Sequence, residues 1–322
     1  MDGGAIQRAG PGDLAELQQL QEQATEYLGQ AKSANTLRAY RADWADFTAW
    51  CESAGASSLP AAPETLALYL TARAETHTVS TLQRRLAAIS QAHQARDLET
   101  PTKHLLVRSV WAGIRRVRGT AQQGKAAAVT EDLRLMVERL PLTLIGIRDR
   151  ALLLVGFAGA FRRSELVSLN RADVTVGRDG VTVHLRRSKT DQEGAGTTKG
   201  IPYGSNPDTC PVRSLREWLS RTGIKSGPLF RPVDRHGRLG EGRLSDRAVA
   251  LIVKRCAAAA GLKAADYSGH SLRAGLATSA AAAGVSERAI MKQTGHKSER
   301  MVRKYIREGS LWRDNAAGRV GL

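Results

Sequence analysis

The stretch ALLLVGFAGAFRRSEL, residues 151–166, contains the longest apolar run of the chain and the polar cluster that follows it. The run itself is too short to cross a bilayer, so it predicts a buried helix over residues 147–160. A buried helix that ends at an arginine places a charge beside its own core, which is costly unless an anion or a carboxylate meets it. Arg162 therefore either pairs locally with Glu165 or belongs to a site for an anion.

A strand pattern lies downstream of this helix. Apolar and polar residues alternate in VTVHLRRSKT, residues 181–190, and a turn signal precedes it at residues 178–180. Residues 174–176 are the expected hairpin partner, and residues 197–203 are the expected third strand. Helical patterns dominate elsewhere, so the sequence predicts a mainly α fold, with an α-helical N-terminal domain and a mixed α+β domain that holds a small antiparallel sheet.

The N-terminal part has the pattern of a helical bundle. Its aromatic stripe at steps of three and four residues, which includes Tyr40, Trp44, Phe47 and Trp50, indicates a core-facing helix side rather than a platform for stacking bases. The stretch GTAQQGKAA is small and polar without periodicity, which is typical of a linker. The predicted organisation is a helical domain, a linker and a second domain, at residues 1–118, 119–127 and 128–322.

The positive charge is concentrated after the first domain. The 322 residues include 48 Lys and Arg against 31 Asp and Glu, a net charge of +17. The first 119 residues hold 13 basic and 12 acidic residues, and residues 120–322 hold the remaining 35 and 19. This excess favours a polyanionic partner, first of all nucleic acid, because neutralising phosphates releases counterions. A basic surface that serves only solubility is the alternative.

Composition argues against several other classes of protein. The chain is 42% hydrophobic and 25% charged, which is ordinary for a globular protein. Its three cysteines, Cys51, Cys210 and Cys256, form no CxxC pair, so we expect neither a disulfide framework nor a zinc knuckle. No signal-peptide pattern opens the chain, and no carboxylate cluster with metal-ligand spacing accompanies the histidines. We expect a cytoplasmic protein with no membrane segment and no metal or other cofactor.

Three more polar clusters follow the first. Lys189 lies where the strand must turn, and His270 and Arg273 have the i, i+3 spacing that places two side chains on one helix face. His296 follows Gly295 and is itself followed by Tyr305 within a basic helical stretch. Each residue taken singly has an ordinary explanation as a cap, a solvated surface group or a packing residue. Together they suit phosphoryl transfer to a protein hydroxyl without a metal ion, because arginines can hold the phosphate oxygens while histidine and lysine move protons.

In that order the motifs resemble those of the tyrosine recombinases, the phage integrase family, along nearly the whole chain. The motifs that carry the resemblance are FRRSEL at 161–166, SKT at 188–190, SGHSLRAG at 268–275, AGVSERAI at 283–290, TGH at 294–296 and KYIR at 304–307. Several spaced motifs in the correct order are far more specific than any one of them. The resemblance implies a C-shaped clamp of two domains around duplex DNA.

The resemblance also implies a role for each site residue. Tyr305 would be the nucleophile that forms a 3′-phosphotyrosine, and Arg162 and Arg273 would hold the phosphate. By the same resemblance, Lys189 would donate a proton to the leaving 5′-oxygen, and His270 would exchange a proton with the tyrosine. His296 would donate a hydrogen bond to the phosphate, and Glu165 would support the first arginine.

The expected partner is double-stranded DNA with an inverted-repeat recombination site, bound by a homo-tetramer on two such sites. The C-terminal tail, with Leu311, Trp312, Ala316 and Val320 on one face, would dock on a neighbouring protomer or pack in cis. Strand exchange would pass through a Holliday junction without ATP. The residues expected to contact DNA are Arg84, Arg85, Arg115 and Arg116.

Two departures from the family pattern affect these assignments. The family often has glycine two positions before the first arginine, where this chain has Ala160, and Arg163 occupies a position that is usually apolar. We prefer Arg162 as the first arginine because it lies three residues before Glu165. A DNA-binding protein without catalysis and a type IB topoisomerase-like nicking–closing enzyme remain the alternative functions.

Overall fold

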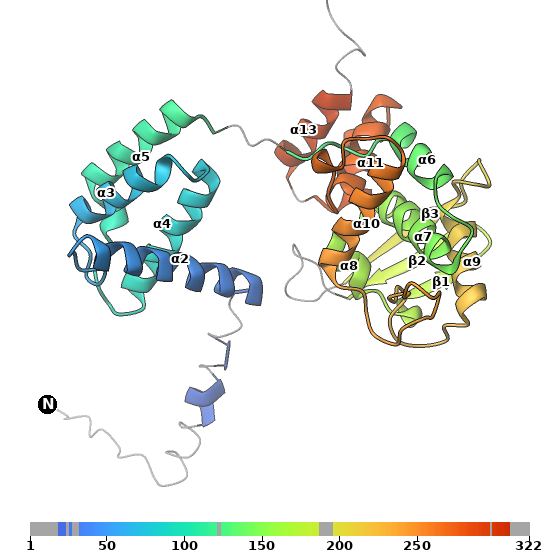
Figure 1. Cartoon of the computed structure of the whole chain (residues 1–322), viewed down its shortest axis with the longest axis horizontal. Helices are drawn as coiled ribbons and strands as arrows, with labels where there is room; N and C mark the ends of the chain where they lie inside the picture. The colour runs from blue at the N-terminus through green and yellow to red at the C-terminus, as the bar shows by residue number, and fades with distance from the viewer. Residues whose placement is uncertain are drawn as a thin grey trace, which may run out of the picture. The chain divides into compact units, whose positions relative to one another are not determined.

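The structure is a computed structural model that describes residues 19–23, 26–27, 32–120, 124–186, 196–296 and 298–309. Within this part of the chain the fold is helical apart from one small sheet (Figure 1). Two compact units divide the chain, residues 1–123 and 124–322, and each has its own hydrophobic core. In the described ranges, no helix has the length and apolar character needed to span a membrane.

The first unit is a bundle of helices around aromatic side chains. Its helices are α2 (Ala34–Ser53), α3 (Pro63–Ala74), α4 (Val79–Gln94), the short η1 (Pro101–Lys103) and α5 (Leu105–Arg118). Ser33 caps α2, because its Oγ accepts a hydrogen bond from the Thr36 amide. Phe47 is fully buried, and its ring meets that of Tyr69 edge-on with centroids 4.9 Å apart. Trp44 and Trp50 pack against the same cluster, as the spacing of the stripe predicts, whereas Tyr40 is half-buried and lies outside it.

A buried ion network ties three of these helices together. Asp46 on α2 accepts hydrogen bonds from Tyr69 Oη (2.8 Å), Arg73 Nε (3.1 Å) and Arg85 Nη1 (2.5 Å). Burial alone would raise the pKa of Asp46, but the bonds from Tyr69 and Arg85 lower it below its usual value. Arg85 also lies 3.8 Å from Asp43. The network is a part of the fold rather than a solvated surface.

The burial and ion pairs of Arg85 argue against its expected contact with DNA. Arg85 is only 7% exposed, and its guanidinium faces Asp43 and Asp46 inside the unit. Arg84, one residue earlier on α4, is more exposed: its side chain is 42% exposed and also pairs with Asp43, at 3.1 Å. Arg115 and Arg116 lie exposed in the last turn of α5.

Replacing Arg85 by methionine tests this structural role. We expect Arg85→Met to lower the free energy of unfolding of the first unit by about 1–3 kcal/mol, because it removes the buried cation that faces both Asp43 and Asp46 and leaves them only the more exposed Arg84 and Arg73. Arg116→Ala, at an exposed position, should change it by less than about 0.5 kcal/mol. Chemical denaturation followed by tryptophan fluorescence measures both, since Trp44, Trp50 and Trp111 lie in this unit. An unchanged midpoint for Arg85→Met would contradict the structural role.

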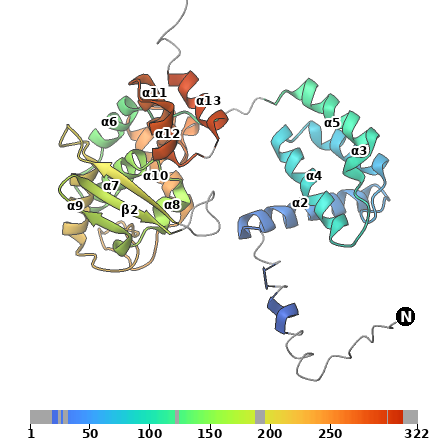
Figure 2. The ribbon, with the colours of Figure 1, turned by 180° about the vertical axis from the view of Figure 1, so that it is seen from behind.

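The second unit is built around α7, a helix buried on nearly all sides. The helices of this unit are α6 (Thr130–Glu138), α7 (Leu144–Ala158), α8 (Arg163–Ser168), η2 (Arg171–Asp173), α9 (Pro211–Thr222), α10 (Asp246–Ala259), η3 (Ala264–Asp266), α11 (Ser271–Ala282), α12 (Glu287–Thr294) and α13 (Glu299–Gly309). Helix α7 packs against α9 and α11, and α9 contacts the sheet (Figure 2). A Cβ at Gly275 of α11 would lie 1.9 Å from the Ala128 carbonyl oxygen, so only glycine allows this close approach.

The sheet is antiparallel and small, as the alternation predicts. Its strands are β1 (Val174–Val176), β2 (Gly180–Leu185) and β3 (Thr197–Pro202), in the order β1-β2-β3. Val181, Val183 and Leu185 are buried, whereas Thr182 and His184 are exposed. The pairing of β2 with β3 places the inward-facing residues of both strands on the side of the core.

Candidate active site

The chain makes a tight turn between α7 and α8. Ala160 has φ +47°, a left-handed conformation that residues with a side chain rarely adopt. Its carbonyl oxygen accepts a hydrogen bond from Arg273 Nη1 at 2.9 Å, which fixes the orientation of the turn. Ala160 occupies the position where the family often has glycine, and its φ gives the physical reason for that preference. The turn carries the chain to Arg162, the residue that caps α8.

Arg162 and Glu165 bond to each other twice. The backbone amide of Arg162 donates to Glu165 Oε2 (2.9 Å), and its guanidinium Nη1 donates to Oε1 (2.5 Å). The carboxylate of Glu165 is buried at 4% exposure, so it holds the first turn of α8 and the arginine side chain in one arrangement. The sequence leaves two explanations open for Arg162: a local pair with Glu165, or a place in a site for an anion. The structure shows the local pair, and this pair does not exclude the anion site.

Arg163 points away from this cluster. Its Nε lies 3.2 Å from Asp246 of α10, and its side chain is half exposed. Arg162, by contrast, is close enough to Arg273, His270 and His296 to shift their pKa values. The geometry therefore favours Arg162 over Arg163 as the first arginine of the site.

Arg273 is a buried cation with an open donor. Its side chain lies on α11 and is only 1% exposed. Nη1 donates to the Ala160 carbonyl, whereas Nη2 has no hydrogen-bond partner among the described residues. A buried guanidinium group with an unused donor is costly unless an anion completes it. Arg273 is thus placed to receive an oxygen of an anionic ligand.

Tyr305 lies between two histidines. Its hydroxyl on α13 is 2.8 Å from Nε2 of His270, which caps the N-terminus of α11. On the other side its ring stacks on that of His296, with centroids 6.0 Å apart and planes inclined by 30°. The structure therefore brings the predicted tyrosine into hydrogen-bond reach of a possible proton acceptor.

The bonds around His296 fix where its ring carries a proton. Thr294 donates its hydroxyl proton to the Ile290 carbonyl (2.7 Å), so its oxygen can only accept from His296 Nδ1 (2.8 Å). The neutral ring then has its proton on Nδ1 and a lone pair on Nε2. His296 can donate a hydrogen bond to an anion through Nε2 only after taking up a second proton.

Positive charge lowers the pKa values across the site. Burial, followed by the charges of Arg273 and Arg162, lowers the pKa of His270 below its usual value and that of His296 to about 4. Burial and Arg162 lower the pKa of Arg273 to about 10, although Glu165 opposes the shift. Lowered pKa values of this kind arise where several cationic groups lie close together and are shielded from water. A bound phosphate would raise these pKa values again. The electrostatics therefore suit an anionic ligand.

The hairpin lysine lies outside the described residues. Lys189 belongs to the segment 187–195, so the structure does not place it. A different lysine, which the sequence analysis missed, lies near the cluster: Lys199 of β3 is buried and interacts electrostatically with Glu165, Arg273 and Arg162. The alternation along β3 could have identified it, because Lys199 lies two residues before Ile201 and therefore on the same inward face of the strand.

A metal centre finds no support among the side chains that the structure describes. No group of three or more His, Cys, Asp or Glu residues in these ranges is arranged to hold a metal ion. The cluster of Arg162, Arg273, His270, His296 and Tyr305 instead combines cations with a hydroxyl nucleophile. Such a set can stabilise the charge on a pentavalent phosphorus and accept the proton that the tyrosine hydroxyl loses.

Two matches to known domains cover most of the chain. Residues 130–310 match the Phage integrase family, and residues 22–108 match the Phage integrase, N-terminal SAM-like domain. The chain belongs to the phage integrase family. It is a tyrosine recombinase, as the motifs predict. Both the family and the enzyme class thus agree with the site built above.

Similar proteins from this family span nearly the same length. The integrase/recombinase xerD homolog of Selenomonas ruminantium is 43% identical over 307 residues, which cover 94% of this chain and 90% of the relative. Recombinase cre of Escherichia phage P1 is 27% identical over 301 residues, covering 86% and 85%. Within the family the motifs favour Cre as the most similar member, but the xerD homolog is more similar to this chain than Cre is.

Solved structures of recombinases share the fold. XerH bound to a palindromic difH substrate superposes with a TM-score of 0.58 at 17% identity, over 80% of this chain and 70% of XerH. A lambda integrase dimer bound to a COC′ core site gives a TM-score of 0.58 at 16% identity, over 94% and 82%. The mainly helical architecture with a small antiparallel sheet is therefore that of the tyrosine recombinases.

Paired alanine variants test which arginine belongs to the site. We expect Arg162→Ala to slow covalent cleavage of DNA by about 100-fold or more, because it removes a cation from the reacting phosphate. Arg163→Ala removes an exposed ion pair with Asp246 and should change the rate by less than about threefold. The rate of protein–DNA adduct formation on a nicked duplex measures both. Cleavage that survives Arg162→Ala but not Arg163→Ala would show that the second arginine is the functional one.

Proposed function

We propose that the chain is a site-specific DNA recombinase that cleaves and rejoins duplex DNA at inverted-repeat sites. The observation that carries this proposal is the hydroxyl of Tyr305, 2.8 Å from His270 Nε2 and within a cluster of cations that includes Arg273 with its open donor. Membership of the phage integrase family and the similarity to the xerD homolog and to Cre support the same activity.

The reaction follows from the residue types present. The Tyr305 oxygen attacks the phosphorus, the P–O5′ bond breaks, and a 3′-phosphotyrosine and a 5′-hydroxyl result. His270 takes the tyrosine proton, and Lys189 supplies a proton to the leaving 5′-oxygen. Arg162 and Arg273 hold the non-bridging oxygens, which gain charge in the transition state.

Religation is the reverse step with a different strand. The tyrosine ester keeps the energy of the phosphodiester, so a 5′-hydroxyl from the partner duplex can attack it without ATP. Two rounds of such exchange pass through a Holliday junction. Neither step needs a metal ion, because the arginines supply positive charge and the histidine and lysine side chains carry the protons.

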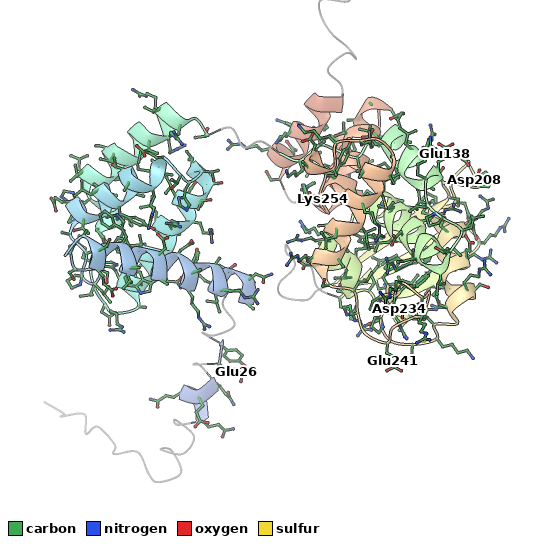
Figure 3. The ribbon with its side chains drawn as sticks, viewed as in Figure 1. Glu26, Glu138, Asp208, Asp234, Glu241 and Lys254 are labelled. Atoms are coloured by element: carbon green, nitrogen blue, oxygen red, sulfur yellow. The ribbon has the colours of Figure 1, made fainter. Side chains whose placement is uncertain are left out.

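The DNA partner is supported by the charge and by solvent-exposed basic residues. Arg115 and Arg116 end α5 in the first unit, and Arg235 and Arg238 lie exposed in the second. The second pair lies in an irregular loop whose Asp234 carboxylate accepts amide hydrogen bonds that order the turn (Figure 3). Both XerH and lambda integrase, which share the fold, were solved on DNA. Contacts of this kind to phosphates give binding that weakens with salt.

Covalent trapping in EDTA tests the proposed chemistry. The protein is mixed with nicked duplexes that carry randomised inverted arms, denatured, and the attached DNA is sequenced. We expect adducts that share one inverted-repeat motif, because a nick lets the 5′-hydroxyl fragment leave and prevents religation. Tyr305→Phe should reduce adducts by about 1,000-fold or more, since phenylalanine has no nucleophilic oxygen.

Other outcomes of the trapping experiment argue against the proposal. Specific binding in a gel shift without any adduct would identify a DNA-binding protein that does not cleave. Adducts abolished by EDTA would indicate a metal-dependent reaction. Adducts that keep forming with Tyr305→Phe would mean that another residue is the nucleophile.

We further propose assembly as a homo-tetramer on two DNA sites through the C-terminal tail. The tail residues Leu311, Trp312, Ala316 and Val320 lie outside the described residues, so this proposal rests on their sequence pattern. Deleting residues 309–322 should abolish cooperative assembly and leave the affinity of a single protomer for a half-site within about threefold of the full chain. Sedimentation of the DNA complexes measures both. Tetramers that persist after the deletion would exclude docking through the tail.

A further inference from the structure

Lys199 of β3 is an ammonium group enclosed by the protein. It is 5% exposed and donates hydrogen bonds to two backbone carbonyls, those of Gly159 (2.8 Å) and Gln293 (2.7 Å). It also lies over the ring of Phe161, 5.1 Å from the centroid. The proposed reaction does not use this lysine. Burying a cation costs free energy unless it is paired or hydrogen-bonded, so its hydrogen-bond partners indicate its role.

The two carbonyls belong to the ends of two different helices. Gly159 follows the last residue of α7, and Gln293 lies in the last turn of α12. The C-terminal end of a helix carries unpaired carbonyls and partial negative charge, so one cation can neutralise both ends at once. Lys199 therefore holds the ends of α7 and α12 together from a third element, the sheet.

Each of these helix ends leads directly into a site residue. After Gly159 the chain runs through Ala160, whose carbonyl binds Arg273, to Arg162. After Gln293 it runs through Thr294, whose hydroxyl binds His296 Nδ1. Gln293 adds a second bridge, because its Nε2 donates to the Ala158 carbonyl at 2.7 Å. A displacement at Lys199 would thus move both sides of the phosphate site.

We infer that Lys199 is a positioning residue: by joining the ends of α7 and α12 it fixes Arg162 and Arg273 relative to His296. The inference rests on the proposed function, because it assumes that these side chains act on one phosphate. Two of the three ammonium protons of Lys199 go to backbone carbonyls, so the contacts of this lysine are mainly to the protein framework.

The charges that face Lys199 come from the same site. Burial, then Arg273 of α11 and Arg162 at the start of α8, lower its pKa to about 8, and Glu165 of α8 acts in the opposite direction. Because the folded pKa lies below the unfolded value, loss of this proton above pH 8 makes the fold no less stable. Loss of the ammonium charge does weaken its grip on the two carbonyls. Alkaline pH should therefore reduce cleavage without reducing stability.

Lys199→Met tests the inference with a side chain of similar length. Lys225→Met is the matched control, since it removes the same charge from an exposed position. With the nicked duplex recovered by covalent trapping, we expect Lys199→Met to slow single-turnover adduct formation at saturating protein about 100-fold, the effect of a small misplacement of reacting groups. Its DNA affinity should stay within about threefold of that of Lys225→Met.

Hydrogen exchange gives a readout that does not depend on cleavage. In the DNA-free protein, Lys199→Met should speed amide exchange in both segments that the lysine joins, residues 155–166 and 288–296, and Lys225→Met should not. A folded Lys199→Met variant that cleaves within about threefold of the parent, or that leaves exchange in both segments unchanged, overturns the inference.

If Lys199→Met does not fold, the pH dependence of cleavage by the parent protein tests the positioning role of Lys199 instead. We expect the adduct rate to fall between about pH 7.5 and about pH 9.5, as a lysine with a lowered pKa loses its proton, while the unfolding midpoint does not fall. Lys199→Arg, which keeps its charge, should cleave with a flat profile in this range. A flat profile for the parent overturns the inference. If the parent forms no Tyr305-dependent adduct at all, the proposed function fails instead.

Discussion

The end of helix α7 is the constraint on which the candidate site depends. Three successive carbonyls there, at Ala158, Gly159 and Ala160, accept hydrogen bonds from Gln293, Lys199 and Arg273 in turn. These partners come from α12, β3 and α11, so one helix end fixes three elements that are distant in sequence. The left-handed conformation at the third carbonyl lets the groups diverge toward separate donors. Because α7 is buried in the close-packed core of the unit, the core holds these carbonyls, and the groups that bind them, in fixed positions.

The site stores electrostatic repulsion in the absence of a ligand. Arg162 and Arg273 lie close together, their charges lower the pKa values of the two histidines, and the Glu165 carboxylate opposes the repulsion between them. Such an arrangement lowers the free energy of binding an anion, because the anion relieves repulsion that the fold already sustains. Because burial and these charges lower the pKa of His296 to about 4, we expect its ring to stay neutral until an anion offsets them. Affinity for a phosphate and readiness for proton transfer are thus set by the same charges.

The sequence predicted the reacting groups better than the groups that support them. Alternation and helical stripes were sufficient for the fold class, and ordered motifs were sufficient for the side chains that meet around Tyr305. Arg85 lies at helical spacing between Leu82 and Ile89, so its place on the apolar face was visible in the sequence, but its carboxylate partners on α2 were not. Lys199 alternates inward along β3, yet the helix ends that it meets become its neighbours only through tertiary packing.

The helix that carries Tyr305 is anchored differently from the rest of the unit. Val302 of α13 packs with Ala277, Ala281 and Ile290 in a small cluster that is separate from the main core. This cluster is much smaller than the main core, so detaching α13 costs less free energy than unfolding the whole unit. Local opening of α13 would withdraw the Tyr305 hydroxyl from His270 while the arginines proposed to bind phosphate stay in place. The order of one short helix would then govern how often the proposed nucleophile is available.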